Sequence, residues 1–249
     1  MTDHTVHLKL RQQTLAQDAG GHAIWQAVAS THALPAAKTA LLLCDVWDSH
    51  WCRGARERLN AMIPRMNAVV QAARQKSIQI IHAPSGTIDV YTDTPARQRV
   101  LGVPPIGPPL PLAHDDPPLP IDDSDGGSDT GEKPGQRPWR RQHAGIEIDQ
   151  SVDGISDSGI EVYSLMQAGG IEHLLIAGVH TNMCILNRSF AIKQMVRWGV
   201  DVMLVRDLTD SMYNPAMRPY VEHDTGTQLV IGYIEKFWCP TIHSGDLLA

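Results

Sequence analysis

Two patterns of hydrophobic residues alternate along this chain. Short, unbroken apolar runs are typical of strands buried on both faces of a sheet, and longer segments with an apolar residue at every third or fourth position are typical of helices. Strands are predicted at residues 39–46, 78–82, 145–149, 173–179 and 200–205, and helices at 53–76, 158–169, 183–198 and 221–238. Because strands that alternate with helices form parallel βαβ units, we expect an α/β fold. It should be a three-layer α/β/α sandwich whose mostly parallel sheet has five or six strands.

Two segments depart from this pattern. Residues 1–38 precede the first strand and are expected to form an N-terminal arm, with an alternating edge strand at 6–12 and a short helix at 22–34. Residues 102–138 hold ten of the 17 prolines and an acidic, glycine-rich run, so they cannot bury enough apolar surface to build their own core. We therefore expect one domain, 1–249, in which 102–138 is an insertion that acts as a lid, an oligomer contact or a flexible surface loop.

The composition narrows the function classes. With 21 basic and 27 acidic side chains the net charge is −6, and no basic cluster resembles a nucleic-acid footprint. No apolar run approaches the roughly 20 residues of a membrane span, and the first residues lack the apolar core of a secretion signal. The four cysteines have no paired spacing, which indicates reduced thiols. We expect a cytoplasmic protein with neither a nucleic-acid nor a membrane partner.

Residues 173–184 carry the strongest chemical signal. An apolar run closes with Gly178 and Val179, a polar turn follows, and Cys184 then lies at the start of a predicted helix. A thiol at a helix N-terminus is expected to have a lowered pKa, and the free backbone N–H groups there can bind an oxyanion. The alternative is that Cys184 is a small buried hydrophobe.

A second candidate residue, Asp45, ends the first predicted strand. In a parallel sheet, ligands bind beyond the carboxyl ends of the strands, so Asp45 and Cys184 can face one crevice. An acid beside a cysteine can accept the thiol proton and return it to a leaving amine. The alternative role for Asp45 is that of a turn or helix-capping aspartate.

The strand that ends at Asp45 and the pattern G-V-x-T-x-x-C that ends at Cys184 resemble the isochorismatase-like cysteine hydrolases, which include nicotinamidases and N-carbamoyl amide hydrolases. The resemblance covers about residues 39–100 and 145–235. It implies that Asp45 is the general base and that Cys184 attacks the carbonyl of a small-molecule amide. It also implies a cis Val179–His180 bond, with the N–H groups of residues 180 and 184 binding the oxyanion. Finally, it implies a homodimer or larger homo-oligomer, for which the N-terminal arm is a candidate interface.

The family's third catalytic group, a lysine, is missing. No lysine lies between Pro134 and Lys193, and the expected position is near residues 150–151. The nearest cationic candidates are Arg140 and His143. An arginine can steady an Asp–Cys pair electrostatically but cannot transfer a proton, whereas a histidine can do both, so His143 is the candidate third catalytic residue. The alternative for the arginines here is an ordinary solvated surface.

Four other residues are candidate oxyanion or substrate contacts. Trp47 and Trp51 follow the first strand and can form an apolar wall for a planar substrate, although packing of the loop onto the scaffold is the commoner role of tryptophan. His180 and Asn182, on the cysteine turn, can offer side-chain hydrogen bonds to the same substrate.

Asp48 and His50 raise the question of a metal ion. Their D-x-H spacing suits a divalent cation, but it directly follows the first strand and does not reproduce the spacing of the family's metal-binding members. We therefore expect no metal and no cofactor, with a divalent ion near these two residues as the alternative.

Together these residues predict a cysteine-dependent hydrolase that cleaves a C–N bond of a small amide or ureido compound through an acyl-enzyme. The alternative is a binding or regulatory protein on the same scaffold, in which the missing lysine marks a decayed triad. A catalytic Cys184 should have a lowered pKa and be alkylated quickly at neutral pH, whereas an inert cysteine should not.

Overall fold

Two apolar runs of the sequence form the centre of the sheet. The computed structural model describes residues 4–249 and places β3 (Thr39–Cys44) between β6 (His173–Val179) and β4 (Gln79–Ala83), parallel to both. The other strands are β1 (Thr5–Gln17), β2 (Ala23–Pro35), β5 (Gly154–Ile155), β7 (Asp201–Asp210) and β8 (Thr241–Ile242). Their order in the sheet is β2-β1-β8-β7-β6-β3-β4-β5, and the only antiparallel pairs among the described residues are β1–β2 and β1–β8.

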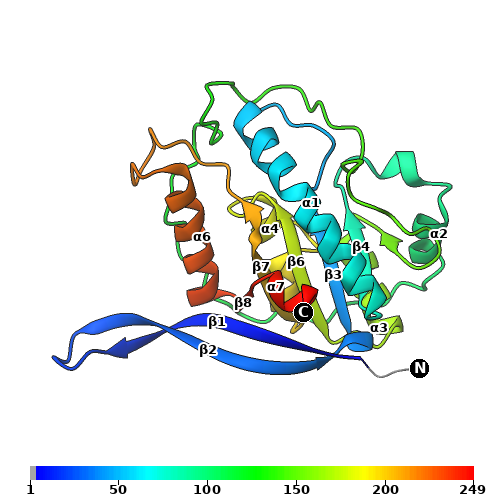
Figure 1. Ribbon diagram of the computed structural model, residues 1–249, viewed down its shortest axis with the longest axis horizontal. Coiled ribbons are helices and arrows are strands. Elements are labelled where there is room, and N and C mark those ends of the chain that lie inside the picture. The colour runs from blue at the N-terminus through cyan, green and yellow to red at the C-terminus, as the bar shows by residue number, and fades with distance from the viewer. Residues whose placement is uncertain (1–3) are drawn as a thin grey trace.

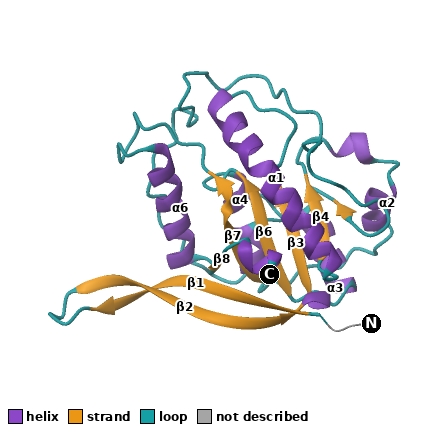
Figure 2. Ribbon diagram, viewed as in Figure 1, coloured by secondary structure: helices purple, strands orange, loops and turns teal. Residues whose placement is uncertain are grey.

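Helices cover both faces of this sheet (Figures 1 and 2). One layer contains η1 (Ala36–Lys38), α1 (Arg53–Gln75) and α7 (Gly245–Leu248), and the other contains α3 (Gly159–Ala168), α4 (Cys184–Asn187), α5 (Ile192–Arg197) and α6 (His223–Phe237). The elements η2 (Ile88–Tyr91) and α2 (Pro95–Leu101) pack beside β5. Each layer packs a separate apolar cluster against the sheet, which confirms the predicted three-layer sandwich. None of the helices between residues 4 and 249 has both the length and the apolar character needed to cross a membrane.

The described part of the N-terminal arm joins the sheet, which is why eight strands form instead of five or six. The helix expected at residues 22–34 is wrong, because residues 23–34 belong to β2, which pairs with β1 along its whole length. The backbone hydrogen bonds of this long hairpin outweigh the local helix propensity of the segment. Midway along β1, the hairpin meets the rest of the sheet through the pairing of Arg11 with Thr241 of β8.

Two other element predictions are corrected by the structure. Residues 145–149 form no strand, because side chains rather than a neighbouring strand bind their backbone; the Glu147 N–H, for example, donates to Asn67 of α1. The helix expected at 183–198 is broken into α4 and α5. Helix α1 is continuous through Pro64.

Residues 102–138, here called the strap, run over the body and contain no regular helix or strand (Figure 1). The N–H of Leu112 donates to the carbonyl of Arg197 in α5. The carboxylate of Asp129 binds Arg58 of α1 at 2.6 Å. The strap is therefore fastened to helices on both faces of the sheet, which favours a fixed cover over a free surface loop.

Gly178 allows β3 and β6 to approach each other closely near their carboxyl ends. Its φ of +121° lies outside the range that other residues adopt without strain, and a Cβ atom there would lie 2.0 Å from the carbonyl oxygen of Cys44. Because the obstacle is backbone in a central strand, it cannot move aside. Both the backbone angle and the close approach therefore require glycine at this position.

We predict that Gly178→Ala lowers the free energy of unfolding by about 2 kcal/mol or more, because the added methyl group forces β3 and β6 apart. Urea denaturation followed by circular dichroism measures this change. The matched control is Gly170→Ala, where φ is +63° but no atom lies within 4 Å of the added Cβ. Equal losses in the two variants would show that the backbone angle alone matters and would contradict the close-approach explanation.

Candidate active site

The carboxyl ends of β3 and β6 bring Asp45 and Cys184 into contact. Cys44 pairs with Gly178 in these neighbouring strands, so the residues that follow each strand meet at one edge of the sheet. The Asp45 carboxylate is fully buried, and its Oδ1 accepts a hydrogen bond of 2.9 Å from the N–H of Ser85. The thiol of Cys184 lies beside this carboxylate, and burial and the carboxylate both raise the pKa of the thiol. The backbone of Asp45 has a φ of +52°, a costly angle for a residue with a side chain.

The cation beside this pair is Arg188. Its Nε donates to Oδ2 of Asp45 at 2.9 Å, and the guanidinium is partly exposed while the carboxylate is buried. Arg188 follows α4 in an extended conformation, with φ −62° and ψ 151°, so the break between α4 and α5 sets its position. The sequence analysis missed Arg188: its place four residues after Cys184 puts both on one face of the helix predicted at 183–198, but the helix ends before Arg188.

The sequence predicted Arg140 or His143 as the third group beside Asp45 and Cys184. The structure corrects this prediction, because Arg188 occupies that position. Among residues 4–249, neither side chain forms a hydrogen bond or ion pair with Asp45. The ring of His143 faces Asn60 of α1 at 3.2 Å. Arg140 is exposed and contacts Asp48 through its backbone N–H at 2.9 Å.

The surroundings of Cys184 keep its thiol protonated. Burial and then the nearby Asp45 carboxylate raise the pKa of Cys184 to about 12, against the lowering effects of Arg188 and of the His180 N–H. The expected lowering of this pKa is wrong, because α4 has only four residues and so contributes little dipole field. Burial disfavours the charged form of Arg188, but the attraction of Asp45 outweighs it, so the pKa of Arg188 is raised and its guanidinium stays charged.

The turn that precedes Cys184 begins with a cis peptide bond between Val179 and His180, the bond that the family resemblance indicated. The ring of His180 is buried and meets the ring of His50 edge-on, with 4.9 Å between centroids. Burial, followed by the charge of His50, lowers the pKa of His180 to about 3. The imidazole is therefore neutral at physiological pH.

Asn182 connects this turn to two other segments. Its Nδ2 donates to the carboxylate of Asp123 in the strap at 2.7 Å, and also to the carbonyl of Met212 at 2.9 Å. Its Oδ1 accepts the N–H of Met212 at 2.9 Å. Both ends of the amide are thus engaged by the protein, and the side chain holds the strap against the turn.

A cavity of about 470 Å³ opens beside Cys184, and the strap supplies part of its wall. The lining residues are Leu119, Asp123, Asn182, Met183, Cys184, Asn187 and Arg188. Another cavity of about 440 Å³ lies at the amino ends of β6 and β7, against Tyr163 and Trp198, but no cysteine lines it. Of these two cavities, the one beside Cys184 is therefore where a bound molecule would lie next to the thiol.

Trp47 and Trp51 lie outside the wall of this cavity. Trp47 is buried, stacks on Trp139 of the segment after the strap with 4.2 Å between ring centroids, and donates from Nε1 to the carbonyl of Ser85 at 3.1 Å. The ring of Trp51 packs against that of His50, with 5.2 Å between ring centroids. Both tryptophans thus pack the loop after β3, the commoner role that the sequence left open.

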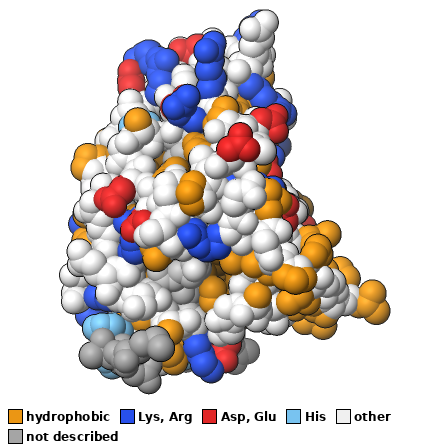
Figure 3. Space-filling view, turned by 90° about the vertical axis from the view of Figure 1, so that its right-hand side faces the viewer, with side chains coloured by type: hydrophobic (Ala, Val, Ile, Leu, Met, Phe, Trp, Pro, Cys, Tyr) orange, Lys and Arg blue, Asp and Glu red, His pale blue; other side chains and the backbone are white. Residues whose placement is uncertain are grey.

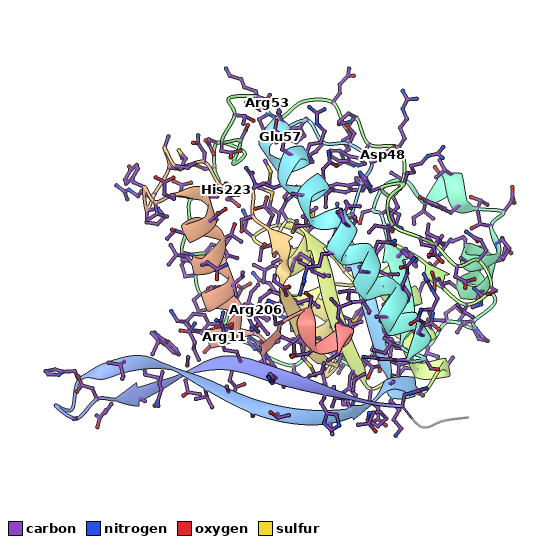
Figure 4. The ribbon with its side chains drawn as sticks, in the orientation of Figure 1. Arg11, Asp48, Arg53, Glu57, Arg206 and His223 are labelled. Atoms are coloured by element: carbon purple, nitrogen blue, oxygen red, sulfur yellow. The ribbon has the colours of Figure 1, made fainter. Side chains whose placement is uncertain are left out.

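Asp48 and His50 each accept a hydrogen bond from the backbone. Oδ1 of Asp48 accepts the N–H of Arg140, and Nδ1 of His50 accepts the N–H of Cys52 at 3.2 Å. Within residues 4–249, no group of three or more His, Cys, Asp or Glu side chains is arranged to hold a metal. Asp48 lies at the upper end of the molecule in Figure 4, where Figure 3 shows Lys and Arg side chains gathered at the surface.

Comparison with known proteins shows the fold. No protein-family model and no curated protein sequence matches the chain. A cysteine hydrolase from Pseudomonas syringae pv. phaseolicola 1448A superimposes with a TM-score of 0.54 and 13% identity, over 86% of this chain and 92% of that one. An isochorismatase from Pseudomonas putida KT2440 superimposes with a TM-score of 0.52 and 12% identity, over 85% and 91% of the two chains. The chain therefore has the fold of isochorismatase-like cysteine hydrolases, in agreement with the resemblance noted in its sequence.

We predict opposite effects of the two charged neighbours on Cys184. Asp45→Asn removes a negative charge and should lower the pKa of the thiol, whereas Arg188→Ala removes a positive charge and should raise it, each by about one pH unit or more. The rate of iodoacetamide alkylation at Cys184, followed by mass spectrometry as a function of pH between about 7 and 9.5, should rise in the first variant and fall in the second. The control Arg140→Ala removes an exposed cation and should leave the profile unchanged. A profile that responds to Arg140→Ala and not to Arg188→Ala would contradict the placement of the cation.

Proposed function

We propose that this protein is a cysteine-dependent hydrolase that cleaves the C–N bond of a small amide or ureido compound through an acyl-enzyme. The observation that carries the proposal is the contact of Cys184 with the buried carboxylate of Asp45, beside Arg188 and a cavity of about 470 Å³. A nucleophile, a proton acceptor and space for a substrate thus meet at the carboxyl edge of the sheet, where ligands bind in this class of fold.

The first step follows from the protonation states. Because the thiol is neutral at pH 7, no thiolate is stored before the substrate binds. Asp45 accepts the thiol proton as the Cys184 sulfur attacks the substrate carbonyl, and a C–S bond forms while the carbonyl oxygen gains the negative charge. The backbone N–H groups of His180 and Cys184 bind this oxyanion.

The second half of the reaction returns the proton. The carboxylic acid of Asp45 protonates the leaving nitrogen as the C–N bond breaks, which leaves a thioester on Cys184. Asp45 then accepts a proton from water, the resulting hydroxide attacks the thioester, and the acid product leaves as the thiol is restored. Arg188 cannot carry a proton, so its role is to orient Asp45 and to stabilise its charge.

The cavity wall supports a small, polar and aliphatic substrate. Leu119 and Met183 provide apolar contact, while Asn187 and Asp123 provide hydrogen-bonding groups. No aromatic side chain lines this cavity, so stacking on a planar ring contributes nothing to the proposed recognition. An open-chain amide or ureido compound fits this wall better than an aromatic amide.

Activity on small amides tests this proposal. A panel containing nicotinamide, maleamate, ureidoacrylate and N-carbamoyl amino acids is assayed for the released amine or ammonia. Cys184→Ala should reduce kcat at least about 1,000-fold, and Asp45→Asn should reduce it about 100-fold or more, because the first lacks the nucleophile and the second the proton acceptor. Mass spectrometry of the quenched wild-type reaction should detect an acyl group on Cys184.

Cys239→Ala is the matched control, because this buried cysteine lies in the apolar core and away from the cavity. It should retain the wild-type kcat. Hydrolysis that persists unchanged in Cys184→Ala would exclude the acyl-enzyme mechanism. Absence of turnover on the whole panel, with no acyl group detected on Cys184, would favour the binding or regulatory protein instead.

A further inference from the structure

The β1–β2 hairpin leaves one long strand edge uncovered. β2 is the outermost strand of the sheet, and every residue in it except Leu34 is exposed. Arg11, which Figure 4 labels where the hairpin passes the body, pairs with Thr241 of β8. Among residues 4–249, the part of β1 beyond Arg11 has no neighbouring strand except β2. A two-stranded ribbon is only marginally stable in water by itself.

Apolar side chains are concentrated on this two-stranded part. Leu15 is 65% exposed, Trp25 42%, Ile24 40% and Val28 38%. Trp25 packs edge-on against Phe237 of α6, with 5.6 Å between ring centroids, and so anchors one face of the ribbon to the body. Ile24 and Val28 lie on the opposite face, because successive side chains of a strand alternate.

The outer strand also lacks the usual protection of a sheet edge. Soluble proteins generally place charged side chains, prolines or bulges on edge strands, because unpaired N–H and C=O groups invite pairing with another chain. From Ala23 to Pro35, β2 contains no Asp, Glu, Lys or Arg, and its single proline is the last residue. Its pairing with β1 is regular along the whole length, without a bulge.

We propose that β2 pairs antiparallel with β2 of a second copy of this chain, about a two-fold axis. The register that pairs all thirteen residues places Ala29, the middle residue, opposite Ala29 of the second copy. Roughly twelve backbone hydrogen bonds then form across the axis. The interface is isologous, the kind that closes as a dimer and does not propagate.

The side chains of β2 are self-complementary in this register. Trp25 lies opposite Ala33 of the second copy, so the largest side chain of the strand faces one of the smallest. Ile24 lies opposite Leu34 of the second copy, which joins the exposed apolar tip of one hairpin to the apolar base of the other. No charged side chain opposes another, so nothing in the strand repels its own copy.

The mass of the full chain in solution tests this interface. Wild-type protein at micromolar concentration should have twice the 27.4 kDa mass of one chain by light scattering after size exclusion. Ala29→Lys should halve that mass, because it sets two like charges about 5 Å apart at the axis. Thr14→Lys, which adds the same charge to an exposed position of the inner strand, should leave the mass unchanged.

A mixture of variants separates a broken interface from a misfolded chain. Ala29→Glu alone should also be monomeric, and an equal mixture of Ala29→Lys and Ala29→Glu should recover the double mass, because opposite charges then meet at the axis. A monomeric wild type, or an oligomer that Ala29→Lys leaves intact, would overturn the proposal. These readouts need no substrate, so they are independent of whether the protein is a hydrolase.

Discussion

The buried carboxylate of Asp45 is the constraint on which the site depends. An isolated charge in a protein interior is strongly unfavourable, so it must be paired and hydrogen-bonded. The N–H of Ser85 and the guanidinium of Arg188 meet this requirement, each at 2.9 Å. The same two contacts leave the carboxylate oriented toward the thiol of Cys184. The same contacts thus compensate the buried charge and position the carboxylate that we propose as the proton acceptor.

Arg188 can meet Asp45 only because the helix after the cysteine stops after one turn. Had α4 continued, residue 188 would have helical backbone angles in place of its observed ψ of 151°. The break costs the hydrogen bonds and dipole of a longer helix, so Cys184 receives little help from a helix N-terminus. Burial and the charges of Asp45 and Arg188, more than the helix, therefore set the pKa of the thiol.

Two segments outside the regular βαβ pattern complete the molecule in different ways. The strap closes the active-site side, because its residues Leu119 and Asp123 form part of the cavity wall and Asp123 binds Asn182. The β1–β2 hairpin extends the sheet at the opposite edge from β5, well separated in strand order from the site. One segment shapes what can reach the cysteine, and the other offers an edge to a second chain.

The sequence by itself determined the central strands and the meeting of Asp45 with Cys184. Both follow from local patterns, because buried parallel strands are unbroken apolar runs whose carboxyl ends share one edge of the sheet. Only the tertiary structure decided that Arg188 supplies the cation, that residues 22–34 form a strand and that the strap lines the cavity. Arg188 and the strap depend on partners far away in the chain, such as Asp45 for Arg188, and the strand in the arm depends on its pairing with β1.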